Sequence, residues 1–295
     1  MNTVPAVVAV VGGGRMGAGI AQVFATAGST VTIAEANQDS AEAAHNRLAA
    51  GLARAAEKGG LEVDPQQVLG RVHTVTSLTE LPAKAGLVIE AVPERLTDKI
   101  TVLCTLEKVV ATDAVLATNT SSLSITELAA ALQHPERFLG MHFFNPVPAS
   151  TLIELIRGPE TAGEVLKSAL DWTHALGKSD VVVKDSPGFA TSRLGVALGL
   201  EAIRMLEEDV ADAASIDRAM ELGYRHPMGP LRSTDLVGLD VRLAIAEHLH
   251  TTLGERFCPP ELLRDKVARG ELGRKTGLGF YSWPQITPPM RSDHD

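Results

Sequence analysis

A histidine and a nearby glutamate could together carry out proton transfer in this chain of 295 residues. A histidine such as His142 can take a proton from a hydroxyl while hydride leaves the same carbon, and can return it in the reverse direction. Glu154 is the only charged residue of the apolar run Leu152–Ile156, where a buried carboxylate needs a partner. A lone histidine among apolar residues is more often structural. Pairing with Glu154 and a nearby cofactor loop favour catalysis, so we predict a His142–Glu154 pair.

A glycine-rich segment near the N-terminus could bind a dinucleotide, because residues 12–17, GGGRMG, match the pattern G-x-G-x-x-G. The segment lies between an expected strand, Val7–Val11, and a helix that begins near Met16. Gly12 allows the tight turn, Gly14 lets a pyrophosphate approach the backbone, and Gly17 lets helix and strand pack closely. The anion would then bind the N–H groups at the helix N-terminus, which makes Gly12, Gly14, Met16 and Gly17 candidate cofactor-binding residues.

An acidic residue at the expected distance after the glycine-rich segment distinguishes NAD from NADP as the dinucleotide. Glu35 ends the next expected strand, Thr30–Ala34, and lies 18 residues after Gly17. Its carboxylate can accept hydrogen bonds from ribose hydroxyls and would repel a 2′-phosphate, which favours NAD over NADP. Arg15 is a contrary signal because a loop arginine can reach a phosphate. The alternative to a cofactor site is a glycine turn in an α/β domain that binds no nucleotide.

Polar residues also follow a later expected strand, Val115–Thr118, at the end where open α/β sheets bind ligands. Asn119 and Ser121 in the run Asn119–Leu123 are therefore candidates to touch substrate and cofactor. Serine and asparagine also begin helices well, so helix capping is an equally good interpretation of this run by itself.

Short apolar runs alternate with helical patterns over the first two-thirds of the chain. This alternation predicts βαβ units and an α/β fold with a doubly wound, mostly parallel, Rossmann-like sheet. The expected strands are Val7–Val11, Thr30–Ala34, Val72–Val75, Leu87–Ala91, Val115–Thr118, Phe138–Met141 and Ser179–Val183. The expected helices between them are Met16–Ala27, Ser40–Lys58, Lys99–Val110, Ile125–Ala131 and Gly163–Leu176.

The pattern changes near residue 185, beyond which strand signals nearly vanish. We expect an all-α second domain, with helices at Ala190–Glu208, Ile216–Leu222 (with Ser215 as N-cap), Leu239–Leu253 and Pro260–Arg269. The predicted domains are residues 1–185 and 186–284, followed by a disordered tail at 285–295 that contains two prolines and a charged end. The long first helix carries more apolar surface than a small helical domain readily hides, which predicts a homodimer.

Composition excludes several classes of protein. The net charge of −9 argues against nucleic acid or an anionic membrane surface as the main partner. Two cysteines are too few for a disulfide framework and fit a reducing cytoplasm, and the nine histidines form no close-spaced metal-binding set. The apolar run Val4–Val11 has no positive charge before it, unlike a signal peptide, and no run is long enough to cross a membrane.

These residues resemble the 3-hydroxyacyl-CoA dehydrogenase family, especially its short single-function members such as 3-hydroxybutyryl-CoA dehydrogenases. The resemblance runs from Val7 to about Trp283. It is carried by Gly12–Ala21, Ile89–Glu94, Asn119–Ile125, Gly140–Pro148, Leu152–Ile156, Asp185–Phe189, His226–Leu231 and Gly273–Tyr281. The resemblance implies an NAD-binding domain, a helical dimerisation domain and an active site in the cleft between them.

The resemblance also implies roles for individual residues. His142 matches the catalytic histidine of the family, Glu154 the acid that orients it, and Ser121 the serine that contacts the substrate oxygen and the nicotinamide side. The positions that contact NAD in the family are matched by Glu94, Lys99, Asn145 and Lys275. For Lys99 taken alone, ordinary surface charge is the more common explanation.

One position departs from the family, and it affects the expected substrate. The family usually has asparagine where this chain has Ser192, near the catalytic pair, which puts substrate contact and chain-length preference in doubt. The family holds coenzyme A phosphates with basic residues near Arg54 and Lys58, and the spacing of Arg47, Arg54 and Lys58 predicts a basic stripe on one helix face. A solvated helix face is an equally good interpretation of that stripe.

Three functions follow as hypotheses. The first is NAD-dependent, reversible oxidation of a short-chain (S)-3-hydroxyacyl-CoA to the 3-oxoacyl-CoA. The second keeps the enzyme class but uses a free hydroxy acid or a sugar acid such as gulonate, because relatives with this fold do so and Ser192 departs from the family. The third is a nucleotide-binding protein that has lost catalysis, as some lens proteins have, and the intact His142–Glu154 pair speaks against it.

Overall fold

The computed structural model describes residues 3–284, and its packing separates the chain into two compact units, residues up to Ser186 and residues from Pro187 onward. The predicted disordered tail, residues 285–295, lies outside the described residues. The strands of the first unit are β1 (Val7–Val11), β2 (Thr30–Ala34), β3 (Val72–Val75), β4 (Leu87–Glu90), β5 (Val115–Thr118), β6 (Phe138–Phe143), β7 (Leu152–Arg157) and β8 (Ser179–Lys184). Its helices are α1 (Arg15–Thr26), α2 (Gln38–Glu57), α3 (Pro65–Leu69), α4 (Leu96–Val109), α5 (Ile125–Ala129) and α6 (Gly163–Ala175), with 3-10 turns η1 (Leu78–Glu80) and η2 (Pro135–Arg137).

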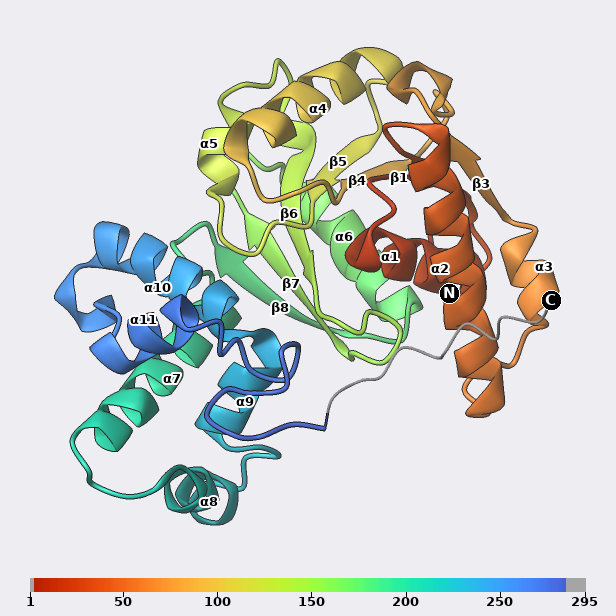
Figure 1. Cartoon of the computed structure of the whole chain (residues 1–295). Helices are drawn as coiled ribbons and strands as arrows, with labels where there is room; N and C mark the ends of the chain where they lie inside the picture. The colour runs from red at the N-terminus through yellow and green to blue at the C-terminus, as the bar shows by residue number, and fades with distance from the viewer. Residues whose placement is uncertain (1–2, 285–295) are drawn as a thin grey trace. The chain divides into compact units, whose positions relative to one another are not determined.

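The eight strands form one sheet in the order β3-β2-β1-β4-β5-β6-β7-β8, which confirms the predicted Rossmann-like, mostly parallel fold (Figure 1). The strands from β1 to β6 run parallel, β7 runs antiparallel to β6, and β8 runs parallel to β7. The carboxyl ends of the first six strands therefore share one edge of the sheet with the beginnings of β7 and β8. Ligands of open α/β sheets bind at this edge.

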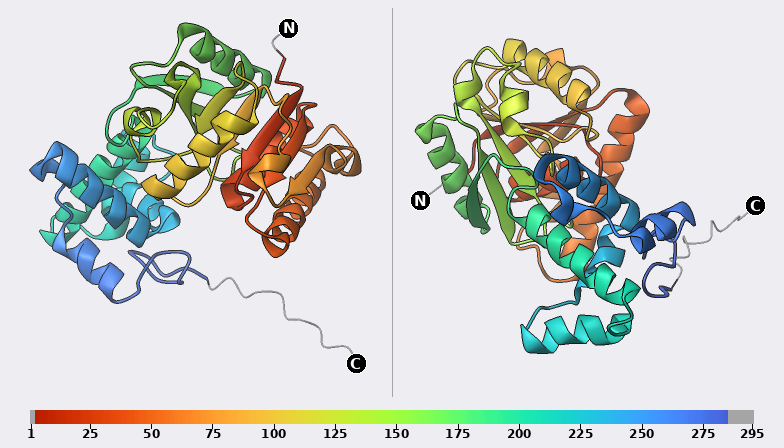
Figure 2. Two further views of the ribbon diagram at one scale, coloured as in Figure 1. Left: turned by 90° about the horizontal axis from the view of Figure 1, so that it is seen from above. Right: turned by 90° about the vertical axis from the view of Figure 1, so that its left-hand side faces the viewer.

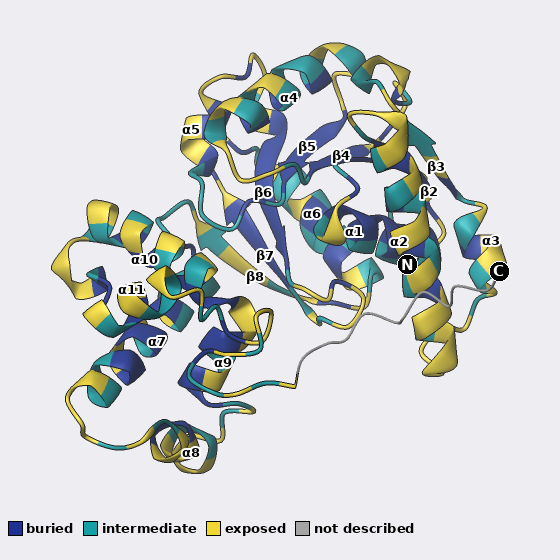
Figure 3. Cartoon of the chain, viewed as in Figure 1, coloured by how far each residue is buried: buried dark blue, intermediate teal, exposed yellow. Residues whose placement is uncertain are grey.

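Helices cover both faces of the sheet, as right-handed crossovers require. Helices α1, α2 and α6 lie on one face, and α4 and α5 lie on the other (Figures 1 and 2). Side chains from α1, α2 and α6 pack with side chains from β1, β4 and β6 in one apolar cluster, which includes Phe24, Leu48 and Phe143. Strands β4, β5 and β6 are buried along their whole length, which explains their continuous apolar sequences (Figure 3).

Two differences from the predicted strands affect the site. The strand expected at Phe138–Met141 continues to Phe143, so that His142 lies within β6 rather than after it. The apolar run around Glu154, whose secondary structure the pattern left open, is the strand β7. In the antiparallel register His142 pairs directly with Glu154, which points both side chains to the same face of the sheet.

The second unit is helical, as predicted. Its helices are α7 (Thr191–Glu207), α8 (Ala213–Gly223), α9 (Pro230–Val237), α10 (Leu239–Leu253) and α11 (Glu261–Ala268), with a 3-10 turn η3 (Glu255–Phe257). Helix α9 was not predicted, and the N-cap of α8 is Asp212, which accepts a hydrogen bond from the backbone of Ser215, rather than Ser215 itself. Among the described residues, we find no helix with the length and apolar character needed to cross a membrane.

Candidate active site

The glycine loop joins β1 to α1 and is held in place by backbone contacts. Gly12 has a φ of +91°, and a Cβ at Gly17 would lie 1.8 Å from the carbonyl oxygen of Gly12. Both positions therefore require glycine. Gly14, which precedes α1, has open space where a side chain would be, so the N-terminal N–H groups of the helix are accessible to an anion.

Glu35 is built into this loop. Its Oε1 accepts a hydrogen bond of 2.6 Å from the backbone N–H of Gly13, although the two residues are far apart in sequence. Arg47 of α2 donates from the other side to the carbonyl oxygen of Gly13, at 2.8 Å. These contacts fix the acid beside the loop, and they turn one member of the predicted basic stripe toward the loop.

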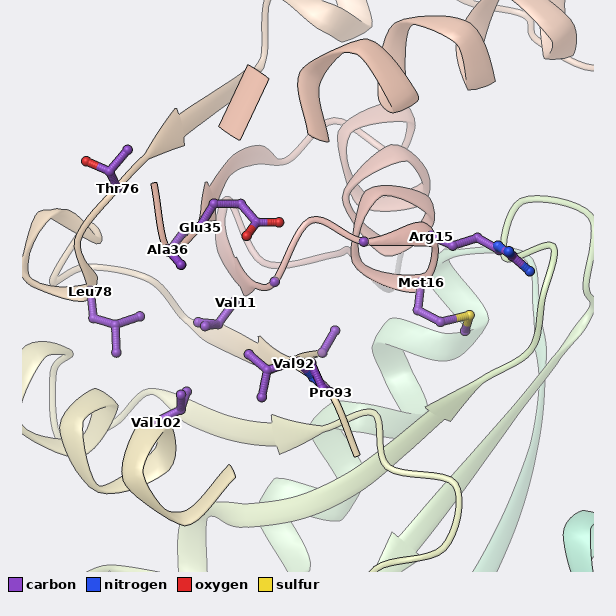
Figure 4. A pocket seen from close by; sticks show the side chains of 14 residues that line it. Val11, Arg15, Met16, Glu35, Ala36, Thr76, Leu78, Val92, Pro93 and Val102 are labelled. Carbon is purple, nitrogen blue, oxygen red and sulfur yellow. The ribbon is translucent and has the colours of Figure 1, made fainter. Parts of the chain in front are cut away.

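A cavity of about 610 Å³ opens between the loop and the ends of β2 and β4 (Figure 4). Gly12, Gly14, Met16 and Glu35, four of the predicted cofactor residues, line it, and Gly17 packs directly beneath them. The other lining residues are mostly small or apolar: Val11, Arg15, Ala34, Ala36, Thr76, Leu78, Ala91, Val92, Pro93 and Val102. An apolar cavity with one carboxylate beside a helix N-terminus fits an adenosine and its phosphates.

Lys99 does not lie on the surface, contrary to the more common explanation of that residue. It occupies the first turn of α4 with only 1% of its side chain exposed. Its ammonium lies 2.7 Å from Oε1 of Glu90 at the end of β4 and 3.3 Å from Oε2 of Glu94. Glu90, fully buried, also accepts hydrogen bonds from the Thr118 hydroxyl at 2.6 Å and from the backbone N–H of Val92 at 2.6 Å. The Lys99 ammonium is therefore paired with two carboxylates, those of Glu90 and Glu94.

Glu94 organises the polar run that follows β5. Its Oε1 accepts hydrogen bonds from the Thr120 hydroxyl, from the backbone N–H of Ser121 at 2.9 Å and from the backbone N–H of Ser122 at 3.2 Å. Burial by itself would raise the pKa of the Glu94 carboxyl, but the Lys99 charge and these hydrogen bonds outweigh it and lower the pKa below 4.5. Glu94 thus stays ionised and holds the turn that carries Ser121.

The predicted contact between His142 and Glu154 is present, between the paired strands β6 and β7. Nδ1 of His142 lies 2.9 Å from Oε2 of Glu154, and both residues are buried, with 7% and 0% exposed. An ionised carboxylate can only accept, so a neutral ring that donates from Nδ1 to it has its lone pair on Nε2. The ring also packs against Phe144, with 4.3 Å between ring centroids. This arrangement can take up and release a proton at Nε2.

Two further predicted residues lie close to this pair in the fold. Asn119 uses its side-chain oxygen to accept the backbone N–H of Phe143 at 2.9 Å, which ties the end of β5 to the end of β6. Asn145 is exposed in the loop that follows β6. Asn119 thus supports the strand that carries His142, and a contact with substrate would be additional to this structural role.

Four further predicted residues take no part in the contacts given above. Arg54 and Lys58 are exposed at the end of α2. Ser192 belongs to the first turn of α7, and Lys275 forms an ion pair with Asp240 after α11, so both lie in the second unit.

Sequence reasoning missed Glu90, Thr118 and Thr120 and most of the apolar lining of the cavity. Glu90 could have been found by the argument that selected Glu154, because it is the only charged residue of a buried strand, Leu87–Glu90. The apolar lining carries no such signal, since valine, leucine and proline are common wherever chains fold.

Comparison with known proteins gives consistent results. Residues 7–186 match the family description "3-hydroxyacyl-CoA dehydrogenase, NAD binding domain", and residues 188–283 match its C-terminal domain. The chain is 43% identical over 280 residues to a protein named probable 3-hydroxybutyryl-CoA dehydrogenase from Bacillus subtilis, covering 94% of this chain and 97% of that one. It is 39% identical to human mitochondrial hydroxyacyl-coenzyme A dehydrogenase, covering 94% and 90%.

A solved structure gives the same result. The (S)-3-hydroxybutyryl-CoA dehydrogenase PaaH1 from Ralstonia eutropha is 39% identical, with a TM-score of 0.90 over 95% of this chain and 100% of that chain. The likeness therefore covers both units and is not restricted to the nucleotide-binding half.

Proposed function

The chain belongs to the 3-hydroxyacyl-CoA dehydrogenase family, and we propose that it oxidises a short-chain (S)-3-hydroxyacyl-CoA reversibly to the 3-oxoacyl-CoA with NAD. The observation that carries the proposal is the buried His142–Glu154 pair, which lies near the carboxyl edge of the sheet that also bears the glycine-loop cavity. A nucleotide-binding domain alone does not define a reaction, and the buried, oriented imidazole at the ligand edge adds a group that can transfer a proton.

The residues of the cavity fit NAD. Gly14 and the N-terminus of α1 would take the pyrophosphate, and Glu35 would accept hydrogen bonds from the adenosine ribose. The Glu35 carboxylate would repel a 2′-phosphate. Arg15 also lines the cavity, and its positive charge would favour a 2′-phosphate. When bound, NAD supplies the acceptor for a hydride, and NADH returns that hydride in the opposite direction.

The protein residues would manage the proton. In the oxidation, Nε2 of His142 takes the hydroxyl proton of the substrate as the C3 hydride departs, which leaves a ketone and an imidazolium. Glu154 holds Nδ1–H and balances the positive charge. In the reduction, the imidazolium returns the proton to the developing alkoxide. Ser121, held by Glu94, would donate to the same oxygen.

Secondary roles are part of the proposal. Glu94, Asn145 and Lys275 would contact NAD, and Lys99 would act through Glu94 because its own side chain is buried. Asn119 and Ser192 would lie on the substrate side, and Arg54 and Lys58 would bind coenzyme A phosphates. A homodimer through the helical unit, a cytoplasmic location and domains at residues 1–185 and 186–284 complete the proposal. The dimer is supported by exposed apolar side chains such as Leu194, Leu222 and Tyr224.

The direct test is steady-state oxidation of NADH with acetoacetyl-CoA, compared with free acetoacetate and with NADPH. We expect turnover with the thioester and NADH, and a much lower kcat/KM for the free acid and for NADPH. Substitution of both Arg54 and Lys58 by Gln should raise KM for acetoacetyl-CoA by roughly tenfold and leave KM for NADH unchanged. Lys84→Gln with Lys108→Gln removes the same charge from other exposed positions and serves as the control.

Two outcomes would select the alternatives. Equal or better kcat/KM with free hydroxy acids would favour a hydroxy-acid or sugar-acid dehydrogenase such as a gulonate dehydrogenase. Binding of NADH without turnover of any acyl-CoA would favour a protein that has lost catalysis.

A further inference from the structure

A buried lysine holds the loop that connects the catalytic strand to the next one. Lys178 follows α6 and immediately precedes β8, and 8% of the residue is exposed. Its ammonium donates to the carbonyl oxygen of Val147 at 2.8 Å and to that of Ser150. Both acceptors belong to the loop of residues 144–151, which joins β6 to β7. None of the predicted site residues explains why a charged side chain lies here.

Sheet topology brings Lys178 to the ligand edge. Because β7 and β8 are parallel to each other, their first residues, Leu152 and Ser179, lie side by side. Because both strands run opposite to β6, this end of the pair lies at the edge where β6 ends. The backbone N–H of Ser179 also donates to the carbonyl oxygen of Thr151 at 2.6 Å. Lys178 thus reaches the loop that follows β6 at Val147 and Ser150, although it is distant from both in sequence.

The loop is held from its other side by α1. Val147 is 2% exposed, and a Cβ built at Gly19 of α1 would lie 2.9 Å from its Cβ. The helix that begins at the glycine loop therefore packs directly on the segment that Lys178 holds. Within the loop, Pro146 accepts the backbone N–H groups of Ala149 and Ser150, at 3.0 and 2.9 Å. A segment fixed at both sides in this way presents Asn145 from a defined position.

The choice of lysine has a physical reason. Two carbonyl groups, one in a buried contact and one in a partly buried contact, point at one place and need donors, and an ammonium supplies three in a compact group. The arrangement carries a cost, because burial lowers the pKa of Lys178, and each acceptor that the described residues provide is a neutral carbonyl oxygen. A charge kept at such a cost is explained better by the position it imposes on the loop than by net stability.

We propose that Lys178 is a positioning residue for the dehydrogenase reaction: it clamps residues 144–151 so that Asn145 and the His142 end of β6 keep a fixed relation to α1 and the cofactor site. The proposal rests on the proposed function for its kinetic consequence but not for the clamp itself. Lys178 acts through the loop backbone and takes no part in proton transfer.

The test compares Lys178→Met with Lys184→Met. Methionine keeps most of the side-chain volume and loses the donors, and Lys184 is the exposed lysine at the opposite end of the same strand. In Lys178→Met, amide hydrogen exchange within residues 144–151 should rise about tenfold while the amides of β1 and β2 keep their protection. KM for NADH should rise and kcat should fall, each by roughly tenfold, because loop misplacement weakens both binding and alignment. Lys184→Met should change neither.

Several results would overturn the clamp. One is that Lys178→Met leaves both the amide hydrogen exchange of the loop and the affinity for NADH within twofold of the wild-type values. Another is exchange that rises equally in the loop and in β1 and β2, since Lys178 would then support the whole fold. If the methionine variant does not fold, Lys178→Leu also removes the donors, and the same two criteria apply to it.

A chemical rescue separates the lost donors from lost packing. In Lys178→Ala, ethylammonium should restore loop protection and NADH affinity at least in part, whereas tetramethylammonium, which has no N–H, should not. Equal behaviour of the two ions would contradict the clamp. An inactive wild-type protein would refute the proposed function, whereas unchanged loop exchange in Lys178→Met would refute the clamp whatever the activity.

Discussion

Two fully buried glutamates lie on different strands of the same sheet and face different partners. Glu90 on β4 meets the ammonium of Lys99, the hydroxyl of Thr118 and a backbone N–H. Glu154 on β7 meets the imidazole of His142. Lysine keeps its charge at neutral pH, whereas histidine exchanges a proton there. Under the proposed function, Glu90 supports the structure around Lys99, whereas Glu154 supports proton transfer by His142, so two identical carboxylates differ in role because their partners differ.

The largest expected effect tests the chemical region. His142→Gln keeps an N–H donor for Glu154 but cannot exchange a proton, so kcat for acetoacetyl-CoA reduction should fall by about 10²- to 10⁴-fold. Steady-state kinetics measures the loss, while NADH fluorescence titration and thermal unfolding should stay near the wild-type values. A kcat within about tenfold of the wild type, or about 1.4 kcal/mol in the barrier, would show that His142 is not the base.

Glu154→Gln provides the second arm of that test. It preserves size but removes the charge that balances the imidazolium, so kcat should fall less than in His142→Gln. A larger loss of kcat than in His142→Gln would assign the proton transfer to Glu154 itself.

The next effect tests the scaffold region. Glu90→Gln removes the nearer and fully buried of the two carboxylate charges beside Lys99, so the free energy of unfolding should fall by about 3–5 kcal/mol, as for other broken buried pairs. Denaturant unfolding measures the change, and Glu57→Gln on the exposed end of α2 is the control for loss of charge alone. If Glu90→Gln instead reduced kcat as much as His142→Gln while stability stayed unchanged, the division between scaffold and chemistry would fail.

The smallest effect concerns Glu94, whose side chain is 36% exposed and is therefore less buried than Glu90 or Glu154. Its pKa is lowered below 4.5 in the folded state, so the unfolded chain binds more protons in the window below that value. The stabilisation is therefore complete above pH 4.5 and is lost as the pH falls through the lowered pKa. Glu94→Gln lacks this dependence, so the stability difference between wild type and variant should shrink on acidification. Urea midpoints recorded from about pH 6 to about pH 3 measure it, and a constant difference would contradict the assignment.

Much of the first unit could be predicted because its signals are local. The strands Val7–Val11, Thr30–Ala34, Val72–Val75 and Val115–Thr118 have the bounds expected from their apolar runs. Weakly patterned elements are harder to predict from sequence. Helices α3 and α9 are short, and β7 is an apolar run whose secondary structure the sequence left open. The register of β6 and β7, which pairs His142 with Glu154, follows from strand pairing rather than from either segment alone.

The sequence by itself determined the glycine loop, its acidic partner Glu35 and the alternation that yields a Rossmann-like sheet, because each is encoded by residue type and spacing within a few dozen positions. Only the tertiary structure decided that Lys99 is buried between Glu90 and Glu94, that Glu94 holds the turn of Ser121, and that Lys178 holds the loop after His142. A charged residue has the same sequence signal whether solvent or a partner surrounds it. Strand order and the reversal at β7 supply the partner, and both depend on the packing of the whole sheet.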